Sequence, residues 1–214
     1  MKNSRDIIPT KERILFCAAD LFAKKGYTET TIRDLAKEVG LKGASIYSHF
    51  PSKKSILEYI LDDYIKINTA IFLSKDVPAM LRENPTPEGI LKCMQLTFPK
   101  EKEEYYYKVL CVLMQEQHRN PLIRNFMAEQ FILSGEENIK KIIEFLKEMN
   151  VLRKDTDPDF WMKTGTSLLY AFASRATLGI GDSMPDFTGM NMAGLLKFMY
   201  EIMFKLCGTA KETP

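Results

Sequence analysis

The chain has 214 residues, with 30 Lys and Arg against 28 Asp and Glu, and a formal net charge of +2 at pH 7. Its hydrophobic fraction of 45% and charged fraction of 27% are ordinary for a soluble globular protein and argue against disorder. No run approaches the ~20 apolar residues that a membrane span requires, and the start lacks the apolar core of a signal peptide. We therefore expect a cytoplasmic protein of one or two domains.

The four cysteines are scattered and form no C-x-x-C pair, which is typical of buried thiols in a reducing compartment: Cys17, Cys93, Cys111 and Cys207. The chain has only two histidines and no phosphate-binding glycine loop or nucleophile motif. We therefore expect no cofactor, no metal site and no catalytic residue. Acid–base or metal chemistry at the segment from Glu116 to His118 is the alternative.

Basic charge is concentrated at the amino terminus. Residues 1–60 hold 11 Lys and Arg against 7 Asp and Glu, a balance of +4. The remaining 154 residues hold 19 against 21, a balance of −2, and the two balances sum to the total of +2. A domain that binds nucleic acid requires such an excess of positive charge.

The spacing of apolar residues predicts a first helix from about Thr10 to Lys25, which ends at Gly26 because glycine suits a left-handed conformation. A second helix should begin at Thr31, whose hydroxyl can cap free backbone N–H groups. Asp34 follows three residues later and completes an approximate capping box.

Gly40 permits a tight turn after the second helix, and a third short helix should cover about 42–48 before Pro51 ends it. A fourth helix should begin after Ser52 and continue to about Leu73. Two short helices joined by a turn that contains glycine form a helix-turn-helix. Its small core should contain the larger apolar side chains of this region: Phe22, Leu35, Ile46, Tyr47 and Phe50.

From about residue 76 the pattern changes to longer helices, separated by proline and glycine. Helices are predicted over 102–118, 121–148, 159–179 and 189–207, with a loop over 151–158. No alternating apolar run of useful length indicates a strand. The fold should be all-α, with an N-terminal three-helix helix-turn-helix domain and a larger C-terminal helical domain.

Three lysines lie at predicted helix starts, where helix electrostatics favour acidic residues. Because the N-terminal end of a helix carries about half a positive charge, Lys42, Lys53 and Lys54 are each unfavourable there by up to ~1 kcal/mol. A bound phosphate reverses this sign, since the free N–H groups, the dipole and the lysine then face one anion. The pattern indicates phosphate binding beside the helix-turn-helix, and an ordinary solvated charge is the alternative for any one lysine.

The third helix is small and polar on its outward side. Its small side chains would let the backbone enter the major groove of DNA, where Lys42 can reach guanine acceptors. The hydroxyl of Tyr47 and the imidazole of His49 suit phosphate oxygens, and Arg33 of the second helix can contact either base or backbone. The outward residues are Lys42, Gly43, Ala44, Ser45 and Ser48.

Many spaced positions in the amino-terminal third form one pattern. They are the run from Arg13 to Tyr27, then Thr30-Thr31-Ile32, Ala36, Val39-Gly40, Gly43, Ile46-Tyr47-Ser48-His49-Phe50 and Lys53. This pattern covers roughly residues 8–68 and resembles the tetracycline-repressor (TetR) family.

The resemblance implies a DNA-binding domain over 8–68, with its helix-turn-helix at 31–50, and a regulatory and dimerisation domain over 69–208. It implies phosphate contacts by Thr31, Tyr47, His49 and Lys53 and base-facing positions at Lys42, Gly43, Ala44 and Ser45. Arg33 completes the predicted DNA contacts.

Helix-turn-helix proteins usually bind as two-fold dimers whose recognition helices lie about one DNA turn, ~34–36 Å, apart, so a palindromic double-stranded operator is expected. The resemblance implies a homodimer through the last two long helices, 159–179 and 189–207. An intramolecular core is the alternative for the apolar stripe of the last helix. The stripe consists of Met192, Leu195, Leu196, Met199, Ile202, Met203 and Leu206.

Eleven of the 12 methionines follow residue 76, and methionine adapts to irregular apolar space. The resemblance implies a ligand cavity among the middle helices, for which we expect a small hydrophobic effector. Its predicted walls are Phe98, Tyr107, Met114, Phe126, Trp161 and Leu168. The sequence thus predicts a transcriptional repressor that this effector releases from its operator. The alternatives are an effector-independent architectural DNA-binding dimer, and a helical small-molecule-binding protein or enzyme.

Overall fold

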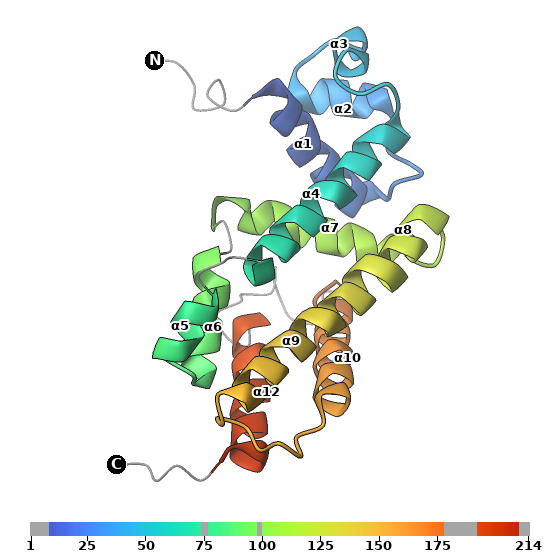
Figure 1. The fold of residues 1–214 in the computed structure, drawn as a ribbon. Helices are drawn as coiled ribbons and strands as arrows, with labels where there is room; N and C mark the ends of the chain where they lie inside the picture. The colour runs from blue at the N-terminus through green and yellow to red at the C-terminus, as the bar shows by residue number, and fades with distance from the viewer. Residues whose placement is uncertain (1–8, 74–76, 98–99, 178–191, 210–214) are drawn as a thin grey trace. The chain divides into compact units, whose positions relative to one another are not determined.

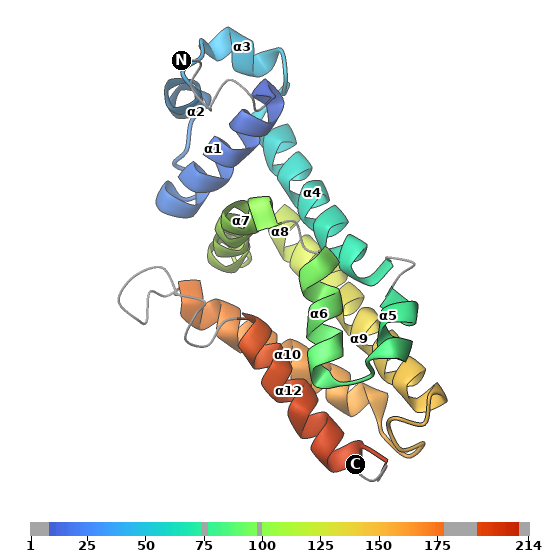
Figure 2. The ribbon, with the colours of Figure 1, turned by 90° about the vertical axis from the view of Figure 1, so that its left-hand side faces the viewer.

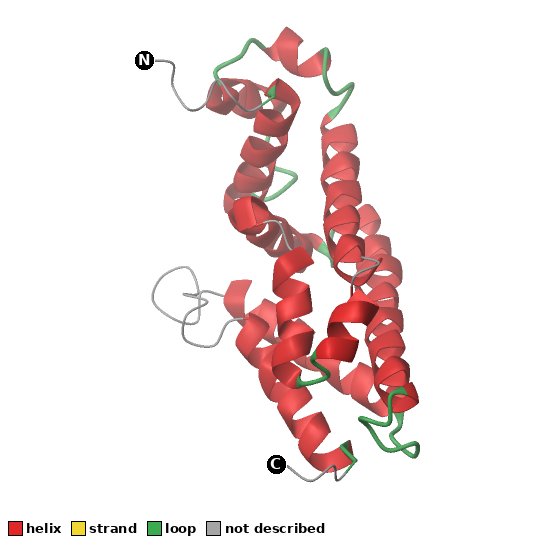
Figure 3. Ribbon diagram, turned by 60° about the vertical axis from the view of Figure 1, so that its left-hand side comes forward, coloured by secondary structure: helices red, strands yellow, loops and turns green. Residues whose placement is uncertain are grey.

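The computed structural model describes residues 9–73, 77–97, 100–177 and 192–209. Within these ranges the chain is helical and contains no strand, as Figure 3 shows, so the predicted all-α class is confirmed. No helix in the described ranges is long and apolar enough to cross a membrane. The chain divides into two compact units, which we call the amino-terminal unit (residues 1–66 with 100–126) and the carboxy-terminal unit (67–99 with 127–214).

The amino-terminal unit begins with α1 (Thr10–Lys25), α2 (Ile32–Val39) and α3 (Gly43–Tyr47), which lie together in Figure 1. They are followed by α4 (Lys53–Leu73), within which the division between the units falls. The later stretch of this unit contains the 3-10 turn η2 (Lys100–Lys102), α7 (Glu103–Glu116) and α8 (Pro121–Phe126). Helix α1 packs against both α2 and α7.

The core of the helix-turn-helix contains four of the five predicted side chains, since Phe22, Leu35, Ile46 and Phe50 are buried. Tyr47 is the exception, because 55% of it is exposed. Its assignment to the core was wrong: Ile46 faces inward from the five-residue helix α3, so its neighbour in the sequence faces outward.

The carboxy-terminal unit contains α5 (Val77–Glu83), α6 (Pro87–Thr97), the π-helix η3 (Met127–Leu133), α9 (Ser134–Glu148), α10 (Pro158–Thr177) and α12 (Met192–Cys207). Helices α10 and α12 pack side by side, as Figure 2 shows. Gly165 permits their close approach, because a Cβ atom at this position would lie 2.6 Å from the Met199 Sδ. Trp161, Met199 and Met203 are buried in the core of this unit.

The segment 121–148 departs from the single regular helix that its sequence predicts. It consists of α8, η3 and α9 in direct succession, and η3 has π-helical hydrogen bonding. A π segment inserts an extra residue into a turn, so the apolar spacing on its two sides cannot follow one continuous α-helical pattern.

Candidate nucleic-acid interface

Helix α2 begins with a complete capping box. The Thr31 hydroxyl accepts a hydrogen bond from the Asp34 backbone N–H at 3.1 Å, and the Asp34 carboxylate accepts one from the Thr31 backbone N–H at 2.9 Å. This confirms the predicted cap. The Thr31 bonds hold the pKa of the Asp34 carboxyl below its ordinary value. The stabilisation that the ionised Asp34 carboxylate contributes is therefore fully present above the pKa that this carboxyl has in the unfolded chain. It is lost as the pH falls through the lowered pKa of the folded state.

Removing this cap should destabilise the helix-turn-helix. We expect Thr31→Ala to lower the free energy of unfolding by ~1 kcal/mol, because the first turn of α2 loses its side-chain acceptor. Urea unfolding followed by circular dichroism measures this change. Thr28→Ala is the control, since Thr28 is an exposed threonine that caps no helix. Equal midpoints for the two variants would contradict the prediction.

The turn between α2 and α3 is fixed by backbone conformation and by α1. Gly40 adopts the left-handed conformation with φ 76° and ψ 34°, as its place in the sequence predicts. The Arg13 Nη2 of α1 donates a hydrogen bond to the Val39 carbonyl oxygen at 2.7 Å and so satisfies a carbonyl at the end of α2. The sequence pattern includes Arg13 but did not reveal this role, because the bond joins residues 26 positions apart.

Helix α3 presents its polar and small residues to solvent. Ile46 is fully buried, while Lys42, Ala44 and Ser48 are exposed and Gly43 and Ser45 are partly exposed. The predicted recognition helix therefore has one buried anchor and an open outer side.

Four exposed side chains around this helix have unused polar groups. Arg33, Lys42, Tyr47 and His49 make no side-chain hydrogen bond or ion pair with any residue that the structure describes. They come from α2, from the residue before α3, from α3 and from the turn after it. A guanidinium, an ammonium, a phenol and an imidazole are thus presented on one short stretch of chain, and all can donate to phosphate or base acceptors.

Lys53 differs from this group, because its ammonium already donates hydrogen bonds within the protein. Its Nζ donates to the carbonyl oxygens of Tyr27 at 2.7 Å, Thr28 at 3.1 Å and Thr30 at 2.8 Å. A lysine has three donors, so a phosphate could bind only in place of one of these bonds. Direct phosphate binding by Lys53 stays a prediction, and it would require that one of these bonds be replaced.

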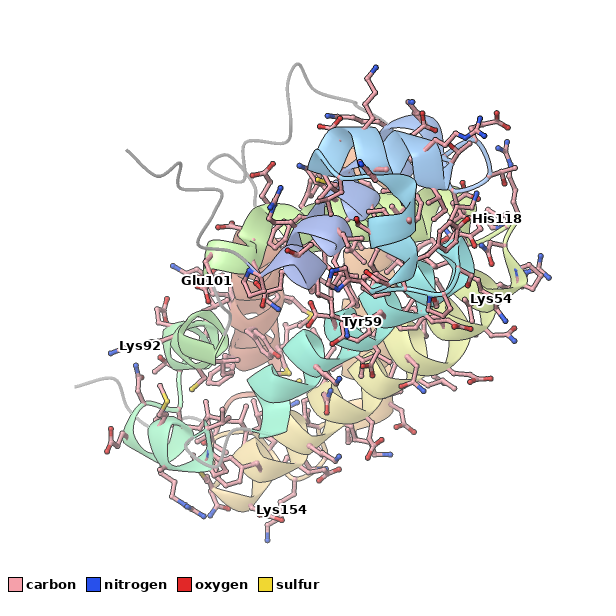
Figure 4. All side chains as sticks on the ribbon, turned by 90° about the horizontal axis from the view of Figure 1, so that it is seen from above. Lys54, Tyr59, Lys92, Glu101, His118 and Lys154 are labelled. Atoms are coloured by element: carbon pink, nitrogen blue, oxygen red, sulfur yellow. The ribbon has the colours of Figure 1, made fainter. Side chains whose placement is uncertain are left out.

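The neighbouring Lys54 remains available on the surface of α4. Its Nζ lies 3.4 Å from the Glu58 carboxylate, an exposed pair of the kind that contributes little to stability. Figure 4 shows Lys54 and Tyr59 on this helix. The Tyr59 ring lies 3.8 Å from the Nζ of Lys11, a cation–π contact that joins α1 to α4.

The predicted ligand-cavity residues are divided between the two units. Tyr107, Met114 and Phe126 belong to the amino-terminal unit, where the Phe126 ring packs edge-on against Tyr64. Trp161 is buried in the carboxy-terminal core, and Leu168 is 38% exposed on α10. Phe98 lies outside the described residues. A ligand site formed by these residues stays a prediction.

The segment from Glu116 to His118 does not form an acid–base pair. Glu116 is buried and accepts a hydrogen bond from the Tyr27 backbone N–H at 2.8 Å, whereas His118, labelled in Figure 4, is exposed. Among the described residues, no group of three or more His, Cys, Asp or Glu could hold a metal ion.

Comparison with known proteins places these features in a family. A family model described as bacterial regulatory proteins, tetR family, matches residues 14–60. IcaR of Staphylococcus aureus strain Newman, an HTH-type negative transcriptional regulator of the biofilm operon icaADBC, is 54% identical over 48 residues. These residues are 22% of this chain and 26% of IcaR, so the chain spans about a quarter of this relative's length.

Two solved structures share the fold over nearly the whole chain. PfmR, a TetR-family transcriptional regulator from Thermus thermophilus, has a TM-score of 0.63 and 25% identity, covering 90% of this chain and 97% of PfmR. A regulator from Saccharomonospora viridis, solved in complex with choline, has a TM-score of 0.58 and 24% identity, covering 92% of this chain and 94% of its own.

A short exposed helix after a glycine turn, braced by a preceding helix, defines the class of helix-turn-helix proteins. The matched amino-terminal domain, the relatives and the all-helical fold identify the family more closely. Residues 14–60 match the tetR family of bacterial regulatory proteins, and the described residues have the fold of solved TetR-family regulators.

Proposed function

We propose that this protein is a transcriptional repressor that binds a palindromic double-stranded operator as a homodimer and is released by a small-molecule effector. The observation that carries the proposal is the set of exposed side-chain donors at Arg33, Lys42, Tyr47 and His49, which bond to no side chain or backbone group in the described part of the chain and lie beside an outward-facing α3. Stability does not require such groups, and duplex DNA offers acceptors for all of them.

The predicted contacts have separate roles. Lys42, Gly43, Ala44 and Ser45 face the bases, because they form the open side of the helix that enters the major groove. The remaining contacts bind phosphates and set the register of the protein on the duplex. They are Thr31, Arg33, Tyr47, His49 and, in place of Lys53, Lys54.

The homodimer is formed through α10 and α12. Phe160, Leu168 and Ala171 are exposed on one side of α10, and Phe198 and Leu206 are exposed on one side of α12. Spacings of eight residues on both helices keep these groups on one face. Met199 and Met203 of the predicted stripe pack inward instead, so only part of that stripe is available to a second copy.

Effector release is supported by the domain organisation and the composition. We assign DNA binding to residues 8–68 and regulation to 69–208, which hold most of the methionines. The structural neighbour from Saccharomonospora viridis contains choline, so a protein of this fold can hold a small molecule. We expect the effector of this chain to be mostly hydrophobic. The alternative is an effector-independent DNA-binding dimer, which no ligand would stabilise against thermal unfolding.

Selection of bound sequences from random duplex DNA, at a stated salt concentration, tests the proposal. A palindromic motif with half-sites about one DNA turn apart is the expected result. Absence of any enriched sequence, together with the same weak affinity for every duplex, would reject a sequence-specific regulator.

Lys54 provides a test of the phosphate contacts. Lys54→Ala should weaken binding to all duplexes alike and reduce the salt slope of the binding constant by ~1, because one counterion fewer is released. Lys66→Ala is a matched control, since Lys66 is an exposed lysine on the same helix with an i, i+4 acidic partner. Fluorescence anisotropy over a salt series measures both slopes. Equal slopes for wild type and Lys54→Ala would remove Lys54 from the interface.

Lys42 tests base recognition in a different way. Lys42→Ala should relax the preference at one position of each half-site, with a loss of ~1–3 kcal/mol of discrimination between the preferred base and the others. Repeating the sequence selection with the variant measures this change. An unchanged motif would show that Lys42 does not read a base.

A further inference from the structure

Residue Tyr27, in the loop between α1 and α2, is bound on both sides by charged groups. Its backbone N–H donates to the Glu116 Oε1 at 2.8 Å, and its carbonyl oxygen accepts from the Lys53 Nζ at 2.7 Å. The Lys53 Nζ also lies 4.5 Å from the centroid of the Tyr27 ring, and the Tyr27 and Phe22 rings form a T-shaped pair with centroids 5.2 Å apart. One loop residue thus connects the last residue of α7 to the first residue of α4.

Glu116 is buried, and Lys53 is partly buried. Glu116 is only 6% exposed, and burial lowers the pKa of Lys53, an effect that Glu29 and Glu116 partly offset. Hydrogen bonds to charged partners in such surroundings are stronger than those between neutral groups. The loop is therefore fixed by strong bonds and not merely by the turn itself.

The approach of Glu116 to the loop depends on the glycine that precedes Tyr27. Gly26 has φ 85°, and a Cβ atom at this position would lie 3.2 Å from the Glu116 Oε1. The buried carboxylate thus lies directly against the backbone at the point where α1 ends.

The same loop leads without interruption into the helix-turn-helix. Thr30 is fully buried, its hydroxyl donates to the Gly26 carbonyl oxygen at 2.8 Å, and its own carbonyl accepts from Lys53 at 2.8 Å. Thr31 then caps α2. A shift of Tyr27 would therefore be transmitted over four residues to the start of α2.

We propose that Glu116 and Lys53 are positioning residues for DNA binding, which hold the loop from Gly26 to Thr31 and thereby set the orientation of α2 and α3 on α1. This role requires no contact between either side chain and DNA. This inference rests on the proposed function, and it adds a residue of α7, outside the matched segment 14–60, to the machinery that binds the operator.

Two variants with matched controls test the inference in the full-length protein. Glu116→Gln keeps the size and one acceptor but removes the charge, and Glu103→Gln makes the same charge change at an exposed position of the same helix. Lys53→Met removes the ammonium, and Lys66→Met is its control on α4. For each variant we would measure affinity for a mixed-sequence duplex and for the selected operator over a salt series, urea unfolding, and amide hydrogen exchange at residue 27 by NMR.

Each test variant should bind the operator about tenfold more weakly than its control, because Glu116→Gln leaves only a weaker, neutral hydrogen bond and Lys53→Met removes the bonds of a charged donor. The salt slope of the binding constant should stay unchanged. The double variant should lose less affinity than the product of the two single fold-losses. The backbone amide of residue 27 should exchange its hydrogen faster than in the control. A role in stability alone would shift the urea midpoint without changing the affinity of the folded protein. That result, or a slope reduced by ~1 in Lys53→Met, would overturn the inference.

The failure of this inference differs from the failure of the proposed function. If the wild type binds no duplex at all, the proposed function is wrong, and the exchange rate at residue 27 still decides whether the two charged groups hold the loop. If the wild type binds and Glu116→Gln matches Glu103→Gln in affinity and exchange, only the positioning role is rejected.

Discussion

Changing Phe160 and Phe198 together to glutamate should leave the protein monomeric and reduce its affinity for a palindromic operator by at least about a hundredfold. Both side chains are more than half exposed, at 58% and 57%. Burying a phenylalanine stabilises by ~1.5–3 kcal/mol, and a two-fold interface contains every residue twice. The four introduced carboxylates would also have to be desolvated beside one another, which is costly.

Analytical ultracentrifugation measures the oligomeric state, and anisotropy with whole and half operators measures the affinity. Leu133→Glu is the matched control, because Leu133 is an exposed leucine, 58% accessible, that lies in η3 and not on α10 or α12. The control should remain dimeric. A double Phe variant that is still a dimer would place the interface on another face of the molecule.

Ile46→Ala should cause the largest loss of stability among single changes in the helix-turn-helix. Ile46 is fully buried, it is the only buried residue in α3, and its carbonyl oxygen accepts from the backbone N–H groups of His49 and Phe50. Truncating a buried isoleucine costs ~2–5 kcal/mol, which is comparable to much of the stability of a small helical domain. The outward residues of α3 would then lose their fixed orientation, so DNA binding should fall as well.

Ile46→Val provides the graded comparison, because removing one methyl group should cost only ~0.5–1.5 kcal/mol. Urea unfolding with and without a saturating duplex separates loss of folding from loss of binding, since bound DNA stabilises only the folded state. An alanine variant that unfolds at the same urea concentration as the valine variant would show that α3 is not anchored by this side chain.

Local signals in the sequence were sufficient for the first three helices. The apolar spacing together with Gly26 gave α1 its observed bounds, and Thr31 with Asp34 gave the start of α2, because each signal acts within one helical turn. The inward position of Ile46 followed from the same periodicity. The outward position of Tyr47 could not be predicted in this way, since an aromatic residue beside a buried one is equally compatible with core and surface.

The role of Lys53 could not be predicted from its position at the start of a helix. Helix electrostatics alone predicts an unsatisfied charge at this position, yet the ammonium is bound by three carbonyl oxygens that lie 23 to 26 residues earlier in the chain. Only the tertiary structure brings them together. The same holds for Glu116, whose bond to Tyr27 spans 89 residues.

The π segment also could not be predicted from the sequence. Residues 121–148 have the length and composition of one helix, and the change in hydrogen bonding over Met127–Leu133 produces no composition signal. It shifts the phase of the apolar pattern by about one residue, which a short amphipathic window cannot distinguish from ordinary variation.

The amino-terminal unit is assembled from two separate stretches of sequence, and this limits how it can be fused to parts of other proteins. A cut after residue 66 would remove α7 and leave Asp20 without Lys108, its 2.8 Å partner, and Tyr27 without Glu116. A chimaera that fuses only the first stretch to another regulator would therefore place a foreign helix against α1. We therefore expect a stable exchange of this unit between relatives only when both stretches are transplanted together.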